Sequence, residues 1–243
     1  MTGTANRSIN TTARLAGGLY LAIAPFAIFG IMYVPSVLVV PGDPSETARN
    51  IKASELLFRM GTVSHLIGQV IFIFVALILY RLLKAVNKEH ALLMVVLALL
   101  SVAMAFLNEA NHLAVLLLLG GPEYRATPAS DQVYDQAMLF LDMRASGILL
   151  TQVFWGLWLL PLGCLVFQSQ FLPWLLGVLV IIGGCGYVVD CGAQLLFPGL
   201  DLGISQFTFV GEVLFPLWLL IRGVNAERWS ALASQPAVGP SDR

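Results

Sequence analysis

The sequence predicts an all-α integral membrane protein, a bundle of six transmembrane helices with both termini in the cytoplasm. Three observations lead to this fold class: 58% of the 243 residues are hydrophobic, only 11% are charged, and the mean hydropathy is +0.84. Soluble domains carry roughly 25% charged residues, so this chain has too little polar surface for a soluble globule. Its hydrophobicity excludes a disordered chain, and its net charge of −1 excludes a basic nucleic-acid-binding protein.

Six segments are apolar and long enough to cross a hydrocarbon core, which takes about 20 residues of α-helix. Their continuous apolar character differs from the one-sided pattern of soluble helices and from the alternating pattern of membrane β-barrels. The last segment is short, and we expect it to extend by a turn at each end. The predicted spans are Leu15–Val39, Phe58–Leu83, Ala91–Leu119, Met138–Phe167, Leu172–Phe197 and Phe207–Ile221.

The domain organisation follows from these spans. We expect one six-helix transmembrane domain at 15–224, a cytoplasmic segment at 1–14 and a cytoplasmic tail at 225–243. The first span is longer than the apolar core of a signal peptide and has no cleavage site of small residues after it, so we expect it to be retained. The tail is polar and contains proline and serine, which predicts a loose segment. All three cysteines lie inside predicted spans, so a secreted disulfide framework is excluded.

Lysine and arginine set the predicted orientation, because they collect on the cytoplasmic side of membrane proteins. Eight of them flank the spans on the side of the N-terminus and four on the other side. Six spans return the chain to its starting side, so both termini are expected there. On the opposite side, Asp43 followed by Pro44 predicts a capped surface helix before the second span. Thr127 followed by Pro128 repeats this pattern.

Ionisable residues inside the spans are the informative positions, because each costs at least ~2.5 kcal/mol to insert at the membrane centre. We counted their depth from the outer end of each span at about 1.5 Å per residue. Five helices then place an ionisable group at a similar depth in the outer half of the membrane. Helical phase aligns them with small residues, which predicts a polar pocket that opens outward. These residues are His65, His112, Arg144, Asp190 and Glu212, with Glu109 slightly deeper.

Charge balance suggests roles for this set. Within the membrane we count four carboxyl groups against a single fixed cation, Arg144, so we expect at least one carboxyl to carry a proton at neutral pH. A proton-holding carboxyl in a dry pocket is a candidate general acid, and equally a candidate proton carrier. The carboxyl groups are Glu109, Asp142, Asp190 and Glu212.

We therefore predict a catalytic set of four residues. Glu109 and Asp190 form the acid/base pair, and Glu212 and Arg144 orient them. A second set is expected to bind the ligand, with its two histidines relaying protons. The predicted binding residues are His65, Gln69, Asn108, His112, Trp155, Tyr187 and Gln194.

No cofactor is predicted, although two possibilities stay open. His65 and His112 lie on neighbouring spans at matched depth and could ligate a haem, or a divalent metal together with Glu109 and Asp190. Glu109 and His112 also have the i, i+3 spacing of di-iron bundles, but those sites need two copies of this motif. The sequence has no phosphate-binding loop, no dinucleotide fingerprint and no zinc-protease or serine-hydrolase motif.

Several stretches resemble the bacterial multipass membrane family called domain of unknown function 4386. The resemblance covers the chain from about Ala13 to Val224 and depends on the order and spacing of its motifs. It implies a six-helix protein of the bacterial inner membrane and supplies no activity. The stretches are Leu79–Leu83, Ala105–Asn111, Phe154–Trp158, Leu172–Val178 and Gly186–Asp190, with Arg59 and the Gly211-Glu212 pair.

The expected function is acid–base chemistry of the isomerase, cyclase or hydratase type on a lipid or an apolar small molecule. A proton-coupled transporter of small solutes is the first alternative, and a structural or haem- or metal-binding membrane protein is the second. The expected partners are the lipid bilayer and an apolar ligand, with no nucleic acid. The oligomeric state is left open.

Overall fold

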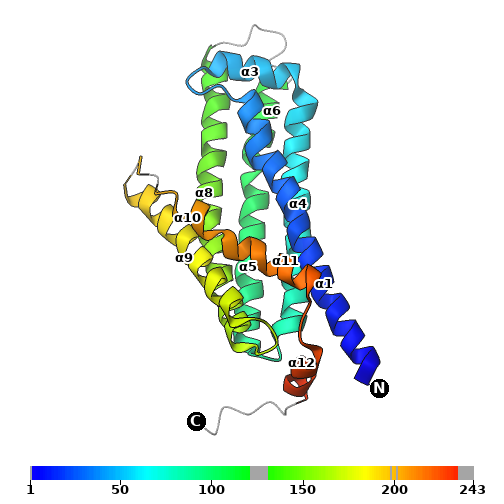
Figure 1. Ribbon diagram of the computed structural model, residues 1–243. Helices are drawn as coiled ribbons and strands as arrows, with labels where there is room; N and C mark the ends of the chain where they lie inside the picture. Colours follow the sequence, from blue (N-terminus) through cyan, green and yellow to red (C-terminus); the bar gives the residue numbers. More distant parts are fainter. Residues whose placement is uncertain (1, 121–130, 198, 201, 235–243) are drawn as a thin grey trace. The chain divides into compact units, whose positions relative to one another are not determined.

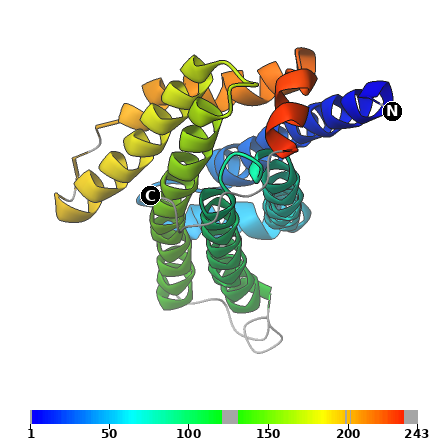
Figure 2. The same cartoon turned by 90° about the horizontal axis from the view of Figure 1, so that it is seen from below.

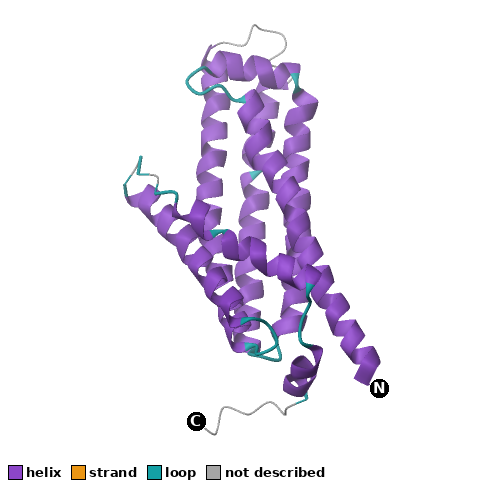
Figure 3. Ribbon diagram, viewed as in Figure 1, coloured by secondary structure: helices purple, strands orange, loops and turns teal. Residues whose placement is uncertain are grey.

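The computed structural model describes residues 2–120, 131–197, 199–200 and 202–234. These residues form helices joined by short turns, with no strand among them (Figure 3). Six helical spans within them are long and apolar enough to cross a membrane, which confirms the predicted all-α fold with six transmembrane helices. The chain is a multipass membrane protein. Its spans are Ser8–Leu38, Glu55–Leu83, Lys88–Gly120, Asp131–Gln168, Trp174–Leu196 and Ile204–Ile221.

The chain folds into two compact units, which we describe separately. Unit 1 comprises Met1–Leu21, Phe74–Ala98 and Trp155–Arg243, and unit 2 comprises Ala22–Ile73 and Leu99–Phe154. Each of the first four spans contributes one segment to each unit.

Unit 2 is built from the end of the first span, the beginning of the second, the end of the third and the beginning of the fourth. Its buried apolar core includes Val34, Phe58 and Val115. Its elements belong to α1 (Thr2–Ala27), η1 (Ile28–Tyr33), α2 (Val34–Leu38), α3 (Pro44–Ala53), α4 (Glu55–Leu83), α5 (Lys88–Asn108), α6 (Ala110–Gly120) and α8 (Asp131–Gln168).

Helix α3 confirms the surface helix predicted before the second span, and it lies across the end of unit 2 (Figure 1). Asp43 is its N-cap and accepts a hydrogen bond of 2.8 Å from the Glu46 amide. Hydrogen bonds from this amide and from the Ser45 hydroxyl hold the pKa of Asp43 below its ordinary value. The similar pattern at Thr127 and Pro128 lies outside the described residues.

The first span is not a regular α-helix throughout, because η1 is a turn of π-helix. It ends just before α2, which carries Pro35 in its first turn. A proline ring clashes with the carbonyl four residues earlier in a regular α-helix, and a widened π turn relieves this clash. The sequence analysis predicted one continuous helix here.

The third span is interrupted at Glu109, between α5 and α6. Asn111 donates hydrogen bonds from Nδ2 to the backbone oxygen and to Oδ1 of Asn108, both at 3.1 Å. Side chains that bond to nearby backbone groups in this way compete with the helical pattern. The interruption, absent from the predicted span, therefore coincides with its most polar stretch.

Unit 1 contains α9 (Trp174–Leu196), α10 (Ile204–Thr208), α11 (Val210–Ile221) and α12 (Ala226–Ala233), together with segments of α1, α4, α5 and α8. Helix α9 packs along α11 (Figure 2). Their backbones approach so closely that a Cβ atom at Gly211 would overlap the backbone of Leu179. The sixth span begins at Ile204, a turn earlier than its apolar core as expected, but it ends at Ile221 without the second extension.

The prediction of a loose C-terminal tail is wrong for part of its length. Residues 226–233 form α12 instead of a loose segment, and Asn225 caps this helix by accepting from the Arg228 amide. The Trp229 indole nitrogen donates to the backbone oxygen of Leu82 at 2.8 Å. The tail has a polar composition, which favoured the prediction of a loose segment, but the hydrogen bond from Trp229 attaches α12 to the end of α4. Residues 235–243 lie outside the described part of the chain.

Candidate functional site

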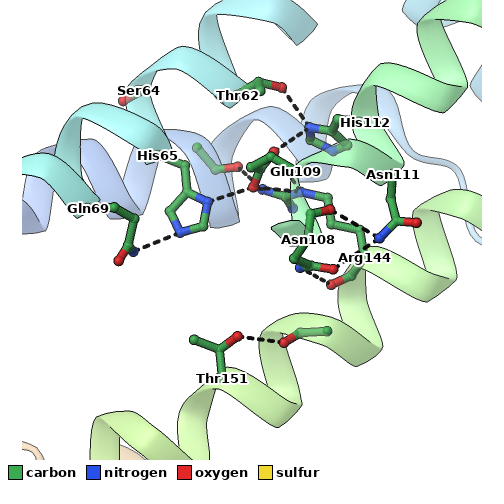
Figure 4. A network of polar contacts seen from close by, with 12 residues as sticks. Thr62, Ser64, His65, Gln69, Asn108, Glu109, Asn111, His112, Arg144 and Thr151 are labelled. Atoms are coloured by element: carbon green, nitrogen blue, oxygen red, sulfur yellow. Dashed lines mark hydrogen bonds and ion pairs between the residues drawn. The ribbon is translucent and has the colours of Figure 1, made fainter. Parts of the chain in front are cut away.

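A buried network in unit 2 is centred on the carboxyl group of Glu109 (Figure 4). Arg144 donates to its Oε1 from Nη2 at 2.8 Å and from Nε at 3.1 Å. The Nδ1 atom of His65 lies 2.6 Å from the same oxygen. Glu109 and His65 are each 2% exposed and Arg144 is 4% exposed. The carboxyl group of Glu109 and the guanidinium group of Arg144 are therefore paired inside the protein.

His112 completes the network on the other carboxyl oxygen. Its Nδ1 lies 3.2 Å from Glu109 Oε2 and 2.8 Å from the hydroxyl oxygen of Thr62. The imidazole ring also packs on Phe58, with ring centroids 4.3 Å apart. Partners on Nδ1 and an aromatic wall fix the orientation of this histidine.

Helical spacing explains why these side chains meet. Thr62, His65 and Gln69 lie three and four residues apart on α4, so they share one face of that helix. Glu109 and His112 are three residues apart and lie one turn from each other. Helix α8 supplies Arg144 to the same point.

A second layer of contacts supports the network. Gln69 Nε2 lies 3.1 Å from His65 Nε2, and Asn108 Nδ2 donates to the backbone oxygen of Arg144 at 2.9 Å. Asn108 fits only because Gly147 has no side chain, since a Cβ atom there would overlap Asn108 Oδ1. Among the described residues, Gln69 Oε1 is buried and has no hydrogen-bond partner.

A cavity of about 180 Å³ adjoins this network in unit 2. Its wall is mostly apolar and includes Val34, Leu38, Phe58 and Ile148. The polar residues on the wall are His112, Arg144 and Asp142. His112 and Arg144 therefore connect the cavity to Glu109, which is itself not part of the wall.

Unit 1 holds a second carboxyl with a different environment. Glu212, on α11, accepts hydrogen bonds from the hydroxyl groups of Tyr20 at 2.9 Å and Tyr187 at 3.0 Å. Tyr20 also packs on Trp158, with ring centroids 5.7 Å apart. Both of these partners, from α1 and α9, are neutral hydroxyl groups, and no ion pair at Glu212 is found among the described residues.

Asp190 has a third kind of environment, also in unit 1. Its carboxyl oxygens accept from the backbone amides of Ile204 at 2.9 Å and Ser205 at 2.6 Å. These amides belong to the first turn of α10, where backbone donors have no partner within the helix. The positive end of a helix favours an anion at this position. Asp190 thus fastens α9 to the start of the sixth span.

The predicted site residues fall into two groups. Unit 2 brings together Glu109, Arg144, His65, His112, Gln69 and Asn108 in one network, while Glu212 and Tyr187 meet in unit 1. Asp190, Trp155 and Gln194 also belong to unit 1. The acid/base pairing of Glu109 with Asp190 stays a prediction.

Two participants were missed by the sequence analysis. Thr62 contacts His112, and Tyr20 contacts Glu212. Thr62 lies one turn before His65, so helical phase could have indicated it. Tyr20 is a hydroxyl-bearing side chain within an apolar span, which is also a detectable signal.

The possible metal and haem ligands of the network contact one another. The described residues contain no group of three or more histidine, cysteine, aspartate or glutamate side chains arranged to hold a metal ion. Arg144 forms an ion pair with the Glu109 carboxyl, which also lies within 3.2 Å of Nδ1 of both His65 and His112. The haem and metal possibilities stay predictions.

Comparisons with known proteins place the chain in a family. Residues 15–223 match the family described as "Domain of unknown function (DUF4386)". An uncharacterised protein of Archaeoglobus fulgidus is 44% identical over 71 residues, which cover 29% of this chain and 43% of that protein. No solved structure matches the chain.

Proposed function

We propose that this chain, which belongs to the DUF4386 family of unknown function, binds a small apolar or lipid-like molecule and performs acid–base chemistry on it. One observation carries the proposal: His112 and Arg144, which both contact Glu109, are the basic groups on the wall of the mostly apolar cavity in unit 2. Ligand sites commonly combine an apolar wall with a few convergent polar groups.

The cavity favours a ligand with an apolar body and one oxygen-bearing end. A volume of about 180 Å³ suits a molecule of several heavy atoms or the end of a longer chain. The guanidinium group of Arg144 donates to carbonyl and carboxylate oxygens. We therefore propose a ligand with a carbonyl oxygen near Arg144 and a carbon chain along Val34, Leu38 and Ile148.

His112 is the proposed acid–base residue. Its Nδ1 faces Glu109 and Thr62, so Nε2 is the nitrogen assigned to the ligand. Nε2 removes a proton from the carbon next to the carbonyl; the electron pair of that C–H bond forms a C=C bond, and the π pair of the carbonyl moves to its oxygen. Arg144 stabilises the resulting enolate. In a ligand with a β,γ double bond, return of the proton from His112 to the γ carbon moves that double bond next to the carbonyl and completes an isomerisation. Glu109 is a positioning residue in this scheme, since it contacts His112 and Arg144.

The bilayer would supply such a molecule. The cavity wall includes Leu38 and Val39, which precede α3, so the cavity lies toward that end of unit 2. With both termini in the cytoplasm of a bacterial cell, as the lysine and arginine counts predict, this end faces outward from the inner membrane.

The first experiment is an exchange assay with a model ketone. The purified full-length protein is incubated in D₂O with 2-heptanone, and deuterium at the carbons next to the carbonyl is followed by NMR. The wild type should accelerate exchange over buffer. His112→Asn should reduce this acceleration by about 10²–10⁴-fold, the range for loss of a general base.

Two comparisons make this experiment specific. His65→Asn changes a histidine on the same carboxyl that is not on the cavity wall, so it should lower exchange much less than His112→Asn. Ala145→Leu enlarges a side chain on the cavity wall, whereas Ala103→Leu makes the same change at a position of unit 2 that is also exposed but not on the wall. Equal exchange in the wild type, His112→Asn and Ala145→Leu would contradict the proposal.

Proton-coupled transport is a second candidate, which Glu212 favours. Its hydrogen-bonding partners are tyrosine hydroxyls, so this carboxyl can take up a proton without breaking an ion pair. In liposomes with a potassium diffusion potential and an internal pH-sensitive dye, the wild type should carry protons and Glu212→Gln should not. Unchanged proton flux in Glu212→Gln would remove this candidate.

A further inference from the structure

Two neighbouring grooves lie at the end of unit 1 that carries α12. The first, of about 760 Å³, lies between the turn after α8 and α12, and its wall includes Phe167, Trp174 and Arg228. The second, of about 470 Å³, lies between α9 and α11. Its wall includes Leu175, Leu179, Leu214 and Arg222. Pro173 belongs to both walls, so the grooves adjoin.

The first groove is held in shape by hydrogen bonds from the segment that contains α12. Arg228 Nη1 donates to the backbone oxygen of Gln170 at 2.9 Å, and the Asn225 amide donates to that of Phe171 at 3.1 Å. Trp229 fastens the other side of α12 to Leu82. The groove is therefore a fixed feature of unit 1.

Charge at this end is predominantly positive. Each groove has one arginine on its wall, and no aspartate or glutamate is among the residues that line either groove. The contact of Trp229 with Leu82 also brings α12 to the end of α4, beside Arg81 and Lys84. Clusters of basic residues at the end of a transmembrane helix attract anionic lipid headgroups.

We propose that the two grooves together bind one anionic phospholipid. The phosphate group lies between Arg228 and Arg222, and an acyl chain follows the apolar groove between α9 and α11. Trp174 supports this placement, because it is 62% exposed at the start of α9, and tryptophan is enriched at membrane–water interfaces. A groove that carries Arg228 and Gln170 on its wall and adjoins an apolar one matches an amphiphile with a negative headgroup. The proposal does not depend on the function proposed for unit 2.

The test compares two lipids on the full-length protein in detergent. Native mass spectrometry measures the affinity for dioleoyl phosphatidylglycerol, which is anionic, and for dioleoyl phosphatidylcholine, which is zwitterionic. The wild type should prefer the anionic lipid. Arg222→Ala with Arg228→Ala should lower the affinity for phosphatidylglycerol by roughly 25-fold, about fivefold for each arginine. Affinity for phosphatidylcholine should change little.

A matched control removes two positive charges elsewhere. Arg49→Ala with Lys52→Ala alters exposed residues of α3 in unit 2 and should keep the lipid preference. Trp229→Phe keeps both arginines but removes the bond to Leu82, so it should weaken phosphatidylglycerol binding several-fold. Arg222→Gln with Arg228→Gln repeats the test if the alanine variant does not fold.

Three outcomes would overturn the proposal. Equal affinity of the wild type for the two lipids would show that the headgroup charge is not recognised. Equal loss in the α3 control would assign the preference to net charge alone. Displacement of the lipid by inorganic phosphate at equal concentration would show that the apolar groove contributes nothing and that the site binds a free anion.

Discussion

The carboxyl groups of Glu109 in unit 2 and Glu212 in unit 1 have opposite kinds of partners. Glu109 contacts an arginine and two histidines, whereas Glu212 contacts two tyrosine hydroxyls. A charge buried with its counter-charge is balanced, so removing either partner leaves an uncompensated ion. A carboxyl held by neutral donors can lose its charge and keep hydrogen bonds. The comparison teaches that one chain can bury a carboxyl group in two ways, against a guanidinium and two imidazoles or against neutral hydroxyl groups.

The largest expected effect comes from removing the cation of the first network. Arg144→Met leaves Glu109 buried without its main counter-charge and should lower the free energy of unfolding in detergent by about 3–5 kcal/mol. Denaturant titration followed by circular dichroism measures this loss. Arg59→Met is the control, because Arg59 forms an exposed ion pair with Glu55, and such pairs contribute at most about 1 kcal/mol.

A double variant sharpens this result. If the cost of Arg144→Met arises from the unpaired charge, adding Glu109→Gln should restore part of the lost stability. Additive losses in the double variant would mean that Arg144 acts through packing, and the contrast between the two carboxyls would then lose its electrostatic basis.

Asp190 should give an intermediate effect. Asp190→Asn keeps one carbonyl acceptor but loses the charge and the second acceptor for the Ile204 and Ser205 amides. Hydrogen bonds to charged groups contribute about 1.5–3 kcal/mol, so we expect a loss of about 2 kcal/mol with faster hydrogen exchange in α10. Hydrogen exchange that stays unchanged at these two amides would show that the carboxyl does not cap the helix.

A smaller loss is expected at Glu212. Glu212→Gln keeps a hydrogen-bonding group between Tyr20 and Tyr187, so the free energy of unfolding should fall by only about 1 kcal/mol. Tyr187→Phe should cost a similar amount. The same titration as for Arg144→Met measures both, and a loss as large as that of Arg144→Met would break the comparison.

The smallest effect concerns Asp43, outside the spans. Its pKa is lowered in the folded protein, so its stabilising contribution is present above the unfolded pKa and is lost as the pH falls through the folded value. Protection of the α3 amides should therefore decrease relative to α6 below about pH 4. Asp43→Asn keeps a capping oxygen and should remove this pH dependence, as hydrogen exchange can show. An unchanged pH dependence in that variant would assign it to another group.

The sequence predicted features that depend on local pattern. Apolar length located the six spans, and Asp43 with Pro44 located α3, because capping is decided by adjacent residues. Helical phase placed His65 and Gln69 on one face of α4. Features set by contacts between distant segments were missed, including the π turn before Pro35 and the attachment of α12 through Trp229.

The sequence did not predict which polar side chains of the site contact each other. The sequence showed an excess of carboxyl groups over arginine within the membrane. It did not predict that Arg144 would form an ion pair with Glu109 or that Tyr20 would donate a hydrogen bond to Glu212. Because several ionisable groups lie at a similar depth, residue type and depth alone are compatible with many different pairs. Only packing of particular helix faces selects one pairing, and that information is not contained in the periodicity of a single helix.

The buried amide of Gln69 can offer His65 either a donor or an acceptor. Its Nε2 lies 3.1 Å from His65 Nε2, and its Oε1 has no hydrogen-bond partner among the described residues. Half a rotation of the amide exchanges these two atoms, so the same side chain can match either a lone pair or an N–H group on the imidazole ring. The surroundings of His65 can therefore adapt by turning a single side chain, with every helix left in place.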